Sequence, residues 1–176
     1  MHSEFYTLMD AVCSELYAGA FWHNVAATAF RKISCRGFAR FSQSEASGDF
    51  DSLQCLQKLL IDNLDYTPNI TADTPKVAWS SYSELPNILQ SWENSEREFA
   101  KTLTKAMHMA CEIDAAIYRK LIDLIEEVQG EATRVRMCAK RLALSNYDGH
   151  DVGHVNKIMH DHYEANPTCQ KADFSI

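Results

Sequence analysis

The chain has 176 residues, of which 46% are hydrophobic and 23% are charged, the composition of a folded globular protein rather than of a disordered one. Its formal net charge is −7 without a basic stripe, which argues against nucleic acids and anionic membranes as partners and favours cations. No apolar run approaches the roughly 20 residues of a membrane span, and the N-terminal stretch MHSEFYTLMDAV does not resemble a secretory signal. We therefore expect a cytoplasmic protein whose six cysteines are reduced thiols.

Apolar residues at helical spacing predict a first helix over residues 3–34 and a second over residues 37–64. The first helix ends in RKISCRG, where basic residues suit a helix C-terminus and Gly37 interrupts the pattern. The segment DYTPNITADTPKVAWSSYSELP follows, rich in turn-forming residues and without a clear period. A connection of that length is unusual inside a compact domain, but it can run along a bundle and join two parallel helices.

Three more helices are predicted after this connection, over residues 83–110, 114–144 and 151–163. The chain shows no alternating strand pattern and no internal repeat. The sequence thus predicts an all-α protein with a four-helix bundle over residues 1–145 and a long crossover between its second and third helices. A short fifth helix within residues 146–166 and a C-terminal tail over residues 167–176 complete the expected organisation.

Two glutamates stand out because they share helix faces with apolar residues. Glu15 lies on the same face of the first helix as Val12 and Trp22, and Glu96 occupies a similar position in the third helix. A buried ionised carboxylate costs several kcal/mol unless it is paired, protonated or bound to a metal. Two readings stay open: each glutamate reaches the surface or a nearby base, or the two face each other across the bundle as ligands of iron or manganese.

Three segments are similar to the bacterial non-haem ferritins: the triplet Glu15-Leu16-Tyr17, the stretch SELPNILQSWENSEREFAKTLTKAMHMA and the stretch SNYDGHDVGHVNKIMHDHY. The resemblance covers residues 7–163 and implies a ferritin-like bundle that assembles into a homo-oligomeric cage of 24 subunits. It also implies a di-iron ferroxidase centre at which Fe(II) is oxidised by O2 before Fe(III) is stored as mineral. In that family the glutamate of the ELY triplet is the first iron ligand, and the alignment places Glu96 on the ligand of the third helix.

The second helix departs from the family pattern. Where the family has Glu-x-x-His, this chain reads SEASGDFDSLQCLQKLL, which places Asp49 on the glutamate and Ser52 on the histidine. A register shifted by one residue would place Gly48 and Asp51 there instead. Aspartate is one methylene shorter than glutamate, so an equivalent role for Asp49 requires the backbones to come closer together.

The fourth helix matches the family in part. Gln129 corresponds to the family's glutamine, Ala132 stands where a carboxylate is expected, and Glu131 matches an acidic position that the family uses for a third, looser iron. Trp22 replaces the tyrosine usually found near the site. The resemblance thus implies Glu15, Asp49 and Glu96 as catalytic residues. It implies as metal ligands Glu15, Asp49, Glu96, Gln129 and Glu131, with Glu45 nearby.

We therefore expect a protein that binds Fe(II) and stores or detoxifies iron, with a non-standard ferroxidase centre. The alternative is a ferritin-shaped shell or scaffold without ferroxidase activity, a reading that Ser52 and Ala132 favour. A smaller di-metal oxidoreductase of the same bundle type is a third possibility, which the short fifth helix disfavours because that helix would be surplus outside a cage.

The remaining polar residues carry simpler expectations. His23 and His108 lie amid apolar residues and are expected to be core or interface histidines with satisfied hydrogen bonds. Glu112 and Asp114 either provide favourable charge at a helix N-terminus or line a three-fold channel of the cage. Four histidines near the C-terminus are either incidental or form an imidazole ring around a four-fold axis; they are His150, His154, His160 and His162.

Overall fold

The computed structural model describes residues 2–73 and 77–165, with side chains described for residues 3–73 and 77–160. Within these residues the chain forms α1 (His2–Lys32), α2 (Arg36–Leu64), η1 (Tyr82–Glu84), α3 (Leu85–Ala110), α4 (Ala115–Leu144) and α5 (Gly149–Ala165). The predicted four-helix bundle with a long crossover and a short fifth helix is confirmed. The predicted tail over residues 167–176 and the side chain of His162 lie outside the described part of the structure.

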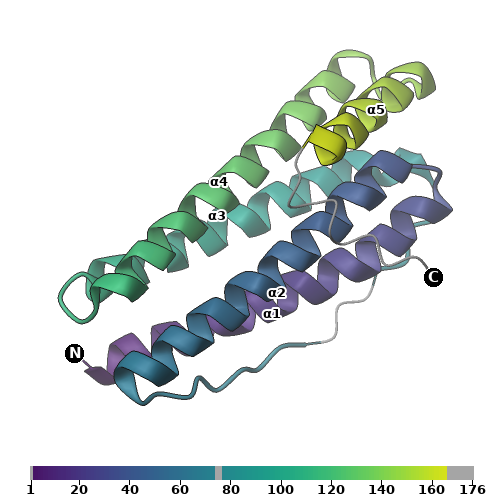
Figure 1. Ribbon diagram of the computed structural model, residues 1–176. Coiled ribbons are helices and arrows are strands. Elements are labelled where there is room, and N and C mark those ends of the chain that lie inside the picture. The colour runs from purple at the N-terminus through teal and green to yellow at the C-terminus, as the bar shows by residue number, and fades with distance from the viewer. Residues whose placement is uncertain (1, 74–76, 166–176) are drawn as a thin grey trace.

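The bundle consists of two antiparallel helix pairs. α1 packs chiefly on α2 and α3 on α4, while α1 meets α3 and α2 meets α4 along looser seams (Figure 1). The crossover between α2 and α3 follows α1: the Tyr66 hydroxyl donates to Asp10 Oδ1 at 2.5 Å, and the Thr71 backbone N–H donates to Ser14 Oγ at 3.0 Å. Because the crossover runs the length of the bundle, α2 and α3 are parallel.

The apolar core is divided into two clusters. One lies between the start of α1, the end of α2, the end of α3 and the start of α4, and includes Phe5 and Leu121. The other lies between the opposite ends of the same helices and α5, and includes Phe30 and Val135. Between the two clusters the helix interiors carry polar side chains, so the core is interrupted at one level of the bundle.

Asp114 is the N-cap of α4. Its Oδ1 accepts hydrogen bonds from the backbone N–H groups of Ala116 and Ile117 at 2.9 and 2.8 Å. These bonds satisfy donors that have no partner within the helix, and the negative charge is favourable beside the positive end of the helix dipole. The prediction of a charge suited to a helix N-terminus is confirmed at Asp114.

α5 is fastened across the start of α2 by a cap that comes from a distant part of the chain. Cys35, the N-cap residue of α2, makes no side-chain cap hydrogen bond. Asn156 of α5 takes over this role, because its Oδ1 accepts from the backbone N–H groups of Gly37 at 2.7 Å and Phe38 at 3.3 Å. A Cβ atom at Gly37 would collide with the backbone carbonyl of Asn156, so glycine permits this close approach.

The Gly37→Ala variant is therefore expected to release α5 from α2. It combines a steric clash against backbone atoms with the loss of the cap, for an expected destabilisation of about 2–4 kcal/mol. Hydrogen exchange of the α5 amides measures the effect directly. Gly153→Ala is the matched control, since a Cβ atom there meets nothing within 4 Å. Equal protection of α5 in both variants would contradict the expectation.

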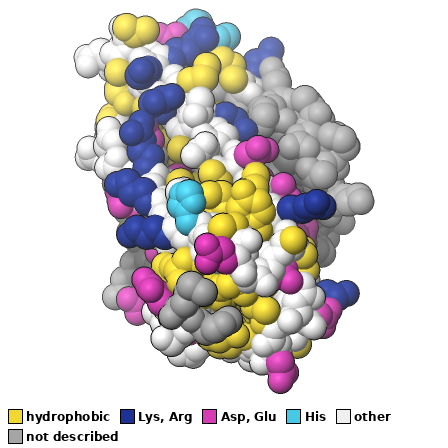
Figure 2. Space-filling model, turned by 90° about the vertical axis from the view of Figure 1, so that its left-hand side faces the viewer, with side chains coloured by type: hydrophobic (Ala, Val, Ile, Leu, Met, Phe, Trp, Pro, Cys, Tyr) yellow, Lys and Arg dark blue, Asp and Glu magenta, His cyan; other side chains and the backbone are white. Residues whose placement is uncertain are grey.

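The surface charge is unevenly spread. Figure 2 shows a face on which Lys and Arg side chains form a row along one edge while Asp and Glu side chains are scattered over the rest. The net charge of −7 therefore does not describe every face of the molecule. In the described residues, every helix is too short or too polar to cross a membrane.

Candidate metal centre

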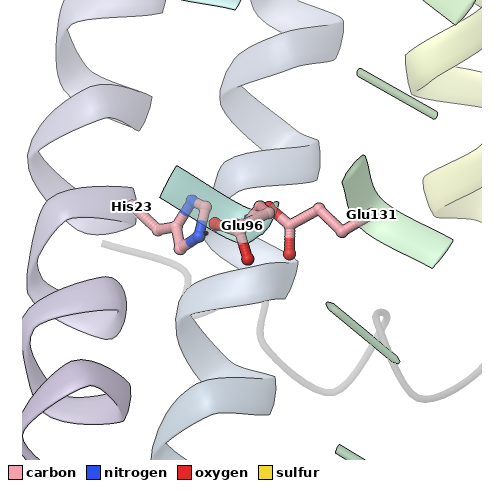
Figure 3. A group of neighbouring side chains, drawn as sticks. All are labelled: His23, Glu96 and Glu131. Carbon is pink, nitrogen blue, oxygen red and sulfur yellow. Dashed lines mark ion pairs between the residues drawn. The ribbon is translucent and has the colours of Figure 1, made fainter. Parts of the chain in front are cut away.

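One histidine and four carboxylates meet in the interruption between the two apolar clusters. His23 comes from α1, Glu45 and Asp49 from α2, Glu96 from α3 and Glu131 from α4. One ligand atom each of His23, Glu96 and Glu131 lies within 4.8 Å of the other two, and Figure 3 shows these side chains pointing toward one another. All four bundle helices thus contribute to a single polar group.

His23 supplies the nitrogen atom of this group. Its Nε2 lies 3.5 Å from Glu131 Oε1 and 3.8 Å from Asp49 Oδ2, and its side chain is only 2% exposed. Burial lowers the pKa of His23 to about 3, so the imidazole is neutral at physiological pH, the form that binds metals. Its Nδ1 is buried without a hydrogen-bond partner among the described residues.

The prediction for His23 is therefore right about burial and wrong about satisfied hydrogen bonds. A buried polar atom without a partner costs about 1–3 kcal/mol, which a protein retains at few positions without a reason. The spacing contains a signal for this residue: His23 follows Glu15 by eight residues, close to two full helical turns, on the same side of α1. His108 is exposed and so is not a core histidine; its role at an interface stays a prediction.

The carboxyl groups of this cluster resist ionisation together. Burial and then the charges of Glu45 and Glu15 raise the pKa of Glu96 to about 8. Burial is also the main cause that raises the pKa of Glu45, and it raises the pKa values of Asp49 and Glu131 well above their usual range. A divalent cation would replace protons here, because it compensates several negative charges that the protein alone does not.

Arg134 contacts the cluster, and Lys120 contacts the neighbouring Ser52. Arg134 Nη2 is 3.7 Å from Glu45 Oε1, and its guanidinium also lies 5.3 Å from the centroid of the Phe41 ring. Lys120 Nζ donates to Ser52 Oγ at 3.1 Å. Arg134 lowers the pKa of Glu45, but burial outweighs it. The protein's own cations therefore compensate little of the negative charge that these carboxyl groups would carry once ionised.

Trp92 orients Glu131. Its indole N–H donates to Glu131 Oε1 at 2.6 Å, and its ring lies 5.3 Å from the His23 ring and 5.2 Å from Trp22. Trp92 is 2% exposed, so this hydrogen bond is shielded from water. The hydrogen bond holds one oxygen of Glu131 in place beside His23. Trp22, which the resemblance places at the family's tyrosine position, packs its ring against those of Trp92 and His23.

The seam between α1 and α3 opens into a cavity of about 220 Å3 above this group. His23, Asp49 and Glu96 line the cavity together with Glu15. Glu15 is exposed, so the expectation that it points into the apolar interior is wrong. The looser packing of α1 on α3 lets solvent reach this level, and Glu15 lies at the cavity while its charge still raises the pKa of Glu96.

A second cavity of about 310 Å3 lies in the opposite seam, between α2 and α4. Glu45, Asp49 and Glu131 line it, together with the exposed Glu127. Because Asp49 lines both cavities, it stands between the two seams of the bundle. The carboxylate cluster is thus bordered by open space on both sides.

The structure separates the other predicted positions from this group. Ser52 is buried and bonded to Lys120, with its hydroxyl also 3.5 Å from Glu127 Oε2. Ala132 is buried, whereas Gln129 is exposed and lines a groove between α3 and α4 that Glu96 also borders. Of the predicted ligands, Asp49, Glu96 and Glu131 come together; the role of Gln129 as a ligand stays a prediction.

The arrangement of the helices matches that of known solved structures. An open-pore ferritin from the hyperthermophilic archaeon Archaeoglobus fulgidus superposes with a TM-score of 0.77, over 89% of this chain and 96% of that one, at 15% sequence identity. The chain has a ferritin-like fold. An engineered closed form of the Archaeoglobus fulgidus ferritin gives a TM-score of 0.75 at 16% identity, with 89% and 94% of the two chains covered. A humanized archaeal ferritin gives 0.74 at 15% identity with the same coverage.

At the level of sequence this ferritin-like chain stands apart. No protein-family model and no curated protein sequence matches it at a significant level. The structural similarity to the solved ferritins establishes the fold, and at 15–16% sequence identity it establishes nothing more. The chemistry must therefore be argued from the residues of the centre: a neutral imidazole on α1, whose Nε2 faces Glu131 and Asp49, and carboxyl groups on α2, α3 and α4.

Proposed function

We propose that this protein is a ferritin-type iron protein of the cytoplasm, which takes up Fe(II) and stores or detoxifies iron inside a homo-oligomeric cage, with 24 subunits as the size that the resemblance implies. The convergence of His23, Glu96 and Glu131 carries the proposal. One nitrogen and several carboxylate oxygens are a ligand set suited to Fe(II), and anionic oxygens favour the ferric product after O2 has accepted the electron.

The proposed metal centre differs from the one expected from the sequence in which helix supplies the nitrogen ligand. The imidazole expected on the second helix is absent at Ser52, and His23 of the first helix offers one instead. Asp49 adds a carboxylate 3.8 Å from His23 Nε2, while Glu15 lies at the rim, where it can attract cations and pass them inward. Fe(II) is the substrate of this site, and the ligands are His23, Glu96 and Glu131 with Asp49.

The alternative function is a ferritin-shaped shell without ferroxidase activity. The bond between Lys120 and Ser52 favours it, because an ammonium group occupies the neighbourhood of the position at which the family pattern expects an iron-binding imidazole. In that case iron would be stored passively, or the shell would serve another cargo.

Aerobic Fe(II) oxidation distinguishes the two functions. Metal-free protein mixed with about two Fe(II) per subunit should show a fast, saturable rise in ferric absorbance, which Glu96→Gln abolishes. Glu15→Gln should slow the reaction only a few-fold, since its side chain lies at the rim. Gln129→Ala tests the remaining predicted ligand. Oxidation no faster than in buffer would reject the ferroxidase function, and the particle mass tests the cage separately.

A further inference from the structure

Gly19 presents a problem that the helix itself does not explain. It lies in the middle of α1 with ordinary helical dihedral angles, since no glycine among the described residues has a positive φ. Glycine in a helix interior is unfavourable relative to alanine, because it fixes more backbone freedom on folding. The reason for a glycine here must therefore be sought in what lies next to it.

The space beside Gly19 is filled by the carboxylate of Asp49. A Cβ atom at Gly19 would lie 2.8 Å from Asp49 Oδ2 and 3.6 Å from its Cγ, closer than a side-chain carbon and an oxygen normally approach. Gly19 and His23 are four residues apart on α1 and so lie on the same face. The same Oδ2 of Asp49 that rests against Gly19 lies 3.8 Å from His23 Nε2.

This contact explains how the shorter side chain of aspartate reaches the centre. The carboxyl group of Asp49 lies against the backbone of α1, and Glu45, Glu96 and Glu127 are close enough that their negative charges, when present, raise its pKa. A methyl group at position 19 would push the carboxylate away from α1, toward the seam between α2 and α4. Because Gly19 has no side chain, the Asp49 carboxylate can occupy the space beside α1.

We propose that Gly19 is a positioning residue of the metal centre: its bare backbone lets the Asp49 carboxylate stand beside His23, where it takes part in binding a divalent cation. The binding of a cation rests on the proposed function, whereas the position of the Asp49 carboxylate rests on its contact with Gly19. These two parts are tested by separate measurements.

The first measurement uses metal-free protein and thermal unfolding. Gly48→Ala is the matched control, because Gly48 is also within a helix and a Cβ atom there meets nothing within 4 Å. Gly48→Ala should raise the melting temperature by about 2–4 °C, the usual gain of replacing glycine in a helix. Gly19→Ala should give no such gain, but Gly19→Ala in an Asp49→Ala background should recover it. A gain in Gly19→Ala equal to that in Gly48→Ala would overturn the proposed contact.

The second measurement titrates Mn2+ and follows tryptophan fluorescence, since Trp92 is bonded to Glu131. Gly19→Ala should weaken Mn2+ binding about 10–100-fold, as loss of a supporting contact at a metal site typically does, and Gly48→Ala should not. In an Asp49→Asn background Gly19→Ala should have no further effect. Unchanged affinity in Gly19→Ala, or a loss that persists undiminished in Asp49→Asn, would overturn the positioning role. Wild-type protein that binds no Mn2+ would reject the proposed function, while the melting temperatures would still decide the contact.

Discussion

The His23→Ala variant is expected to bind Zn2+ at least about 100-fold more weakly than the wild-type protein, because it loses the nitrogen donor of the centre. The affinity for Mn2+ should fall less, by about tenfold, since Mn2+ depends more on the carboxylates that remain. Titration of metal-free protein with each ion, followed by tryptophan fluorescence, gives both values. The ratio of the two losses is the specific signature of a nitrogen ligand.

The stability of the same variant separates a ligand from a core residue. Replacing a well-satisfied buried side chain usually costs a few kcal/mol, but His23 carries an unpartnered Nδ1 whose removal offsets part of that cost. Metal-free His23→Ala should therefore melt within about 5 °C of the wild type, while stabilisation by Zn2+ should be lost. His108→Ala, at an exposed histidine, is the control and should change neither property. Equal Zn2+ affinities of His23→Ala and wild type would contradict the ligand role.

Metal-free protein is expected to become less stable as the pH rises from 5.5 to 8.5. Glu45, Asp49, Glu96 and Glu131 have pKa values raised by folding, to about 8 at Glu96. Such groups contribute stability that is complete below the pKa of the unfolded chain and is lost as the pH rises through the folded pKa. His23 acts in the opposite direction, because its pKa is lowered to about 3 and its contribution is lost as the pH falls below about 6.5.

The four carboxyl groups outweigh the single imidazole, so the melting temperature should fall by at least about 5 °C over this range. Saturating Mn2+ should abolish the decline, since the cation stabilises the ionised carboxylates. The Glu96→Gln/Glu131→Gln variant is the control, because two neutral amides replace groups that must otherwise ionise within the fold. Its metal-free melting temperature should change less with pH. A flat or rising melting temperature in metal-free wild type would show that these carboxyl groups titrate as exposed ones.

The helices, the crossover and the short fifth helix were all predictable from the sequence. Apolar residues recur at helical spacing along each segment because one face of every helix must be buried. This pattern can be recognised within each segment without knowledge of the rest of the chain. Glu96 could be named for the same kind of reason, because its neighbours on the helix face are apolar, whereas Asp49 and Glu131 were implied only by the resemblance to the ferritins. All predicted helix ends agree with the observed ones to within two residues, and the first two residues predicted for the third helix belong to the separate η1.

Only the tertiary structure decided which of these residues meet. In the sequence His23 looks like one more residue of an apolar helix face, and only the packing of α3 and α4 against α1 places Glu96 and Glu131 beside its ring. Glu15 has an equally apolar pattern around it, yet the loose packing of α1 on α3 leaves it exposed. Glycine is required at positions 19 and 37 because Asp49 and Asn156, which are far away in the sequence, lie directly against these positions. Helical periodicity specifies the direction of a side chain, but contact and desolvation depend on the distances between helices, and these are set by the packing of the whole bundle.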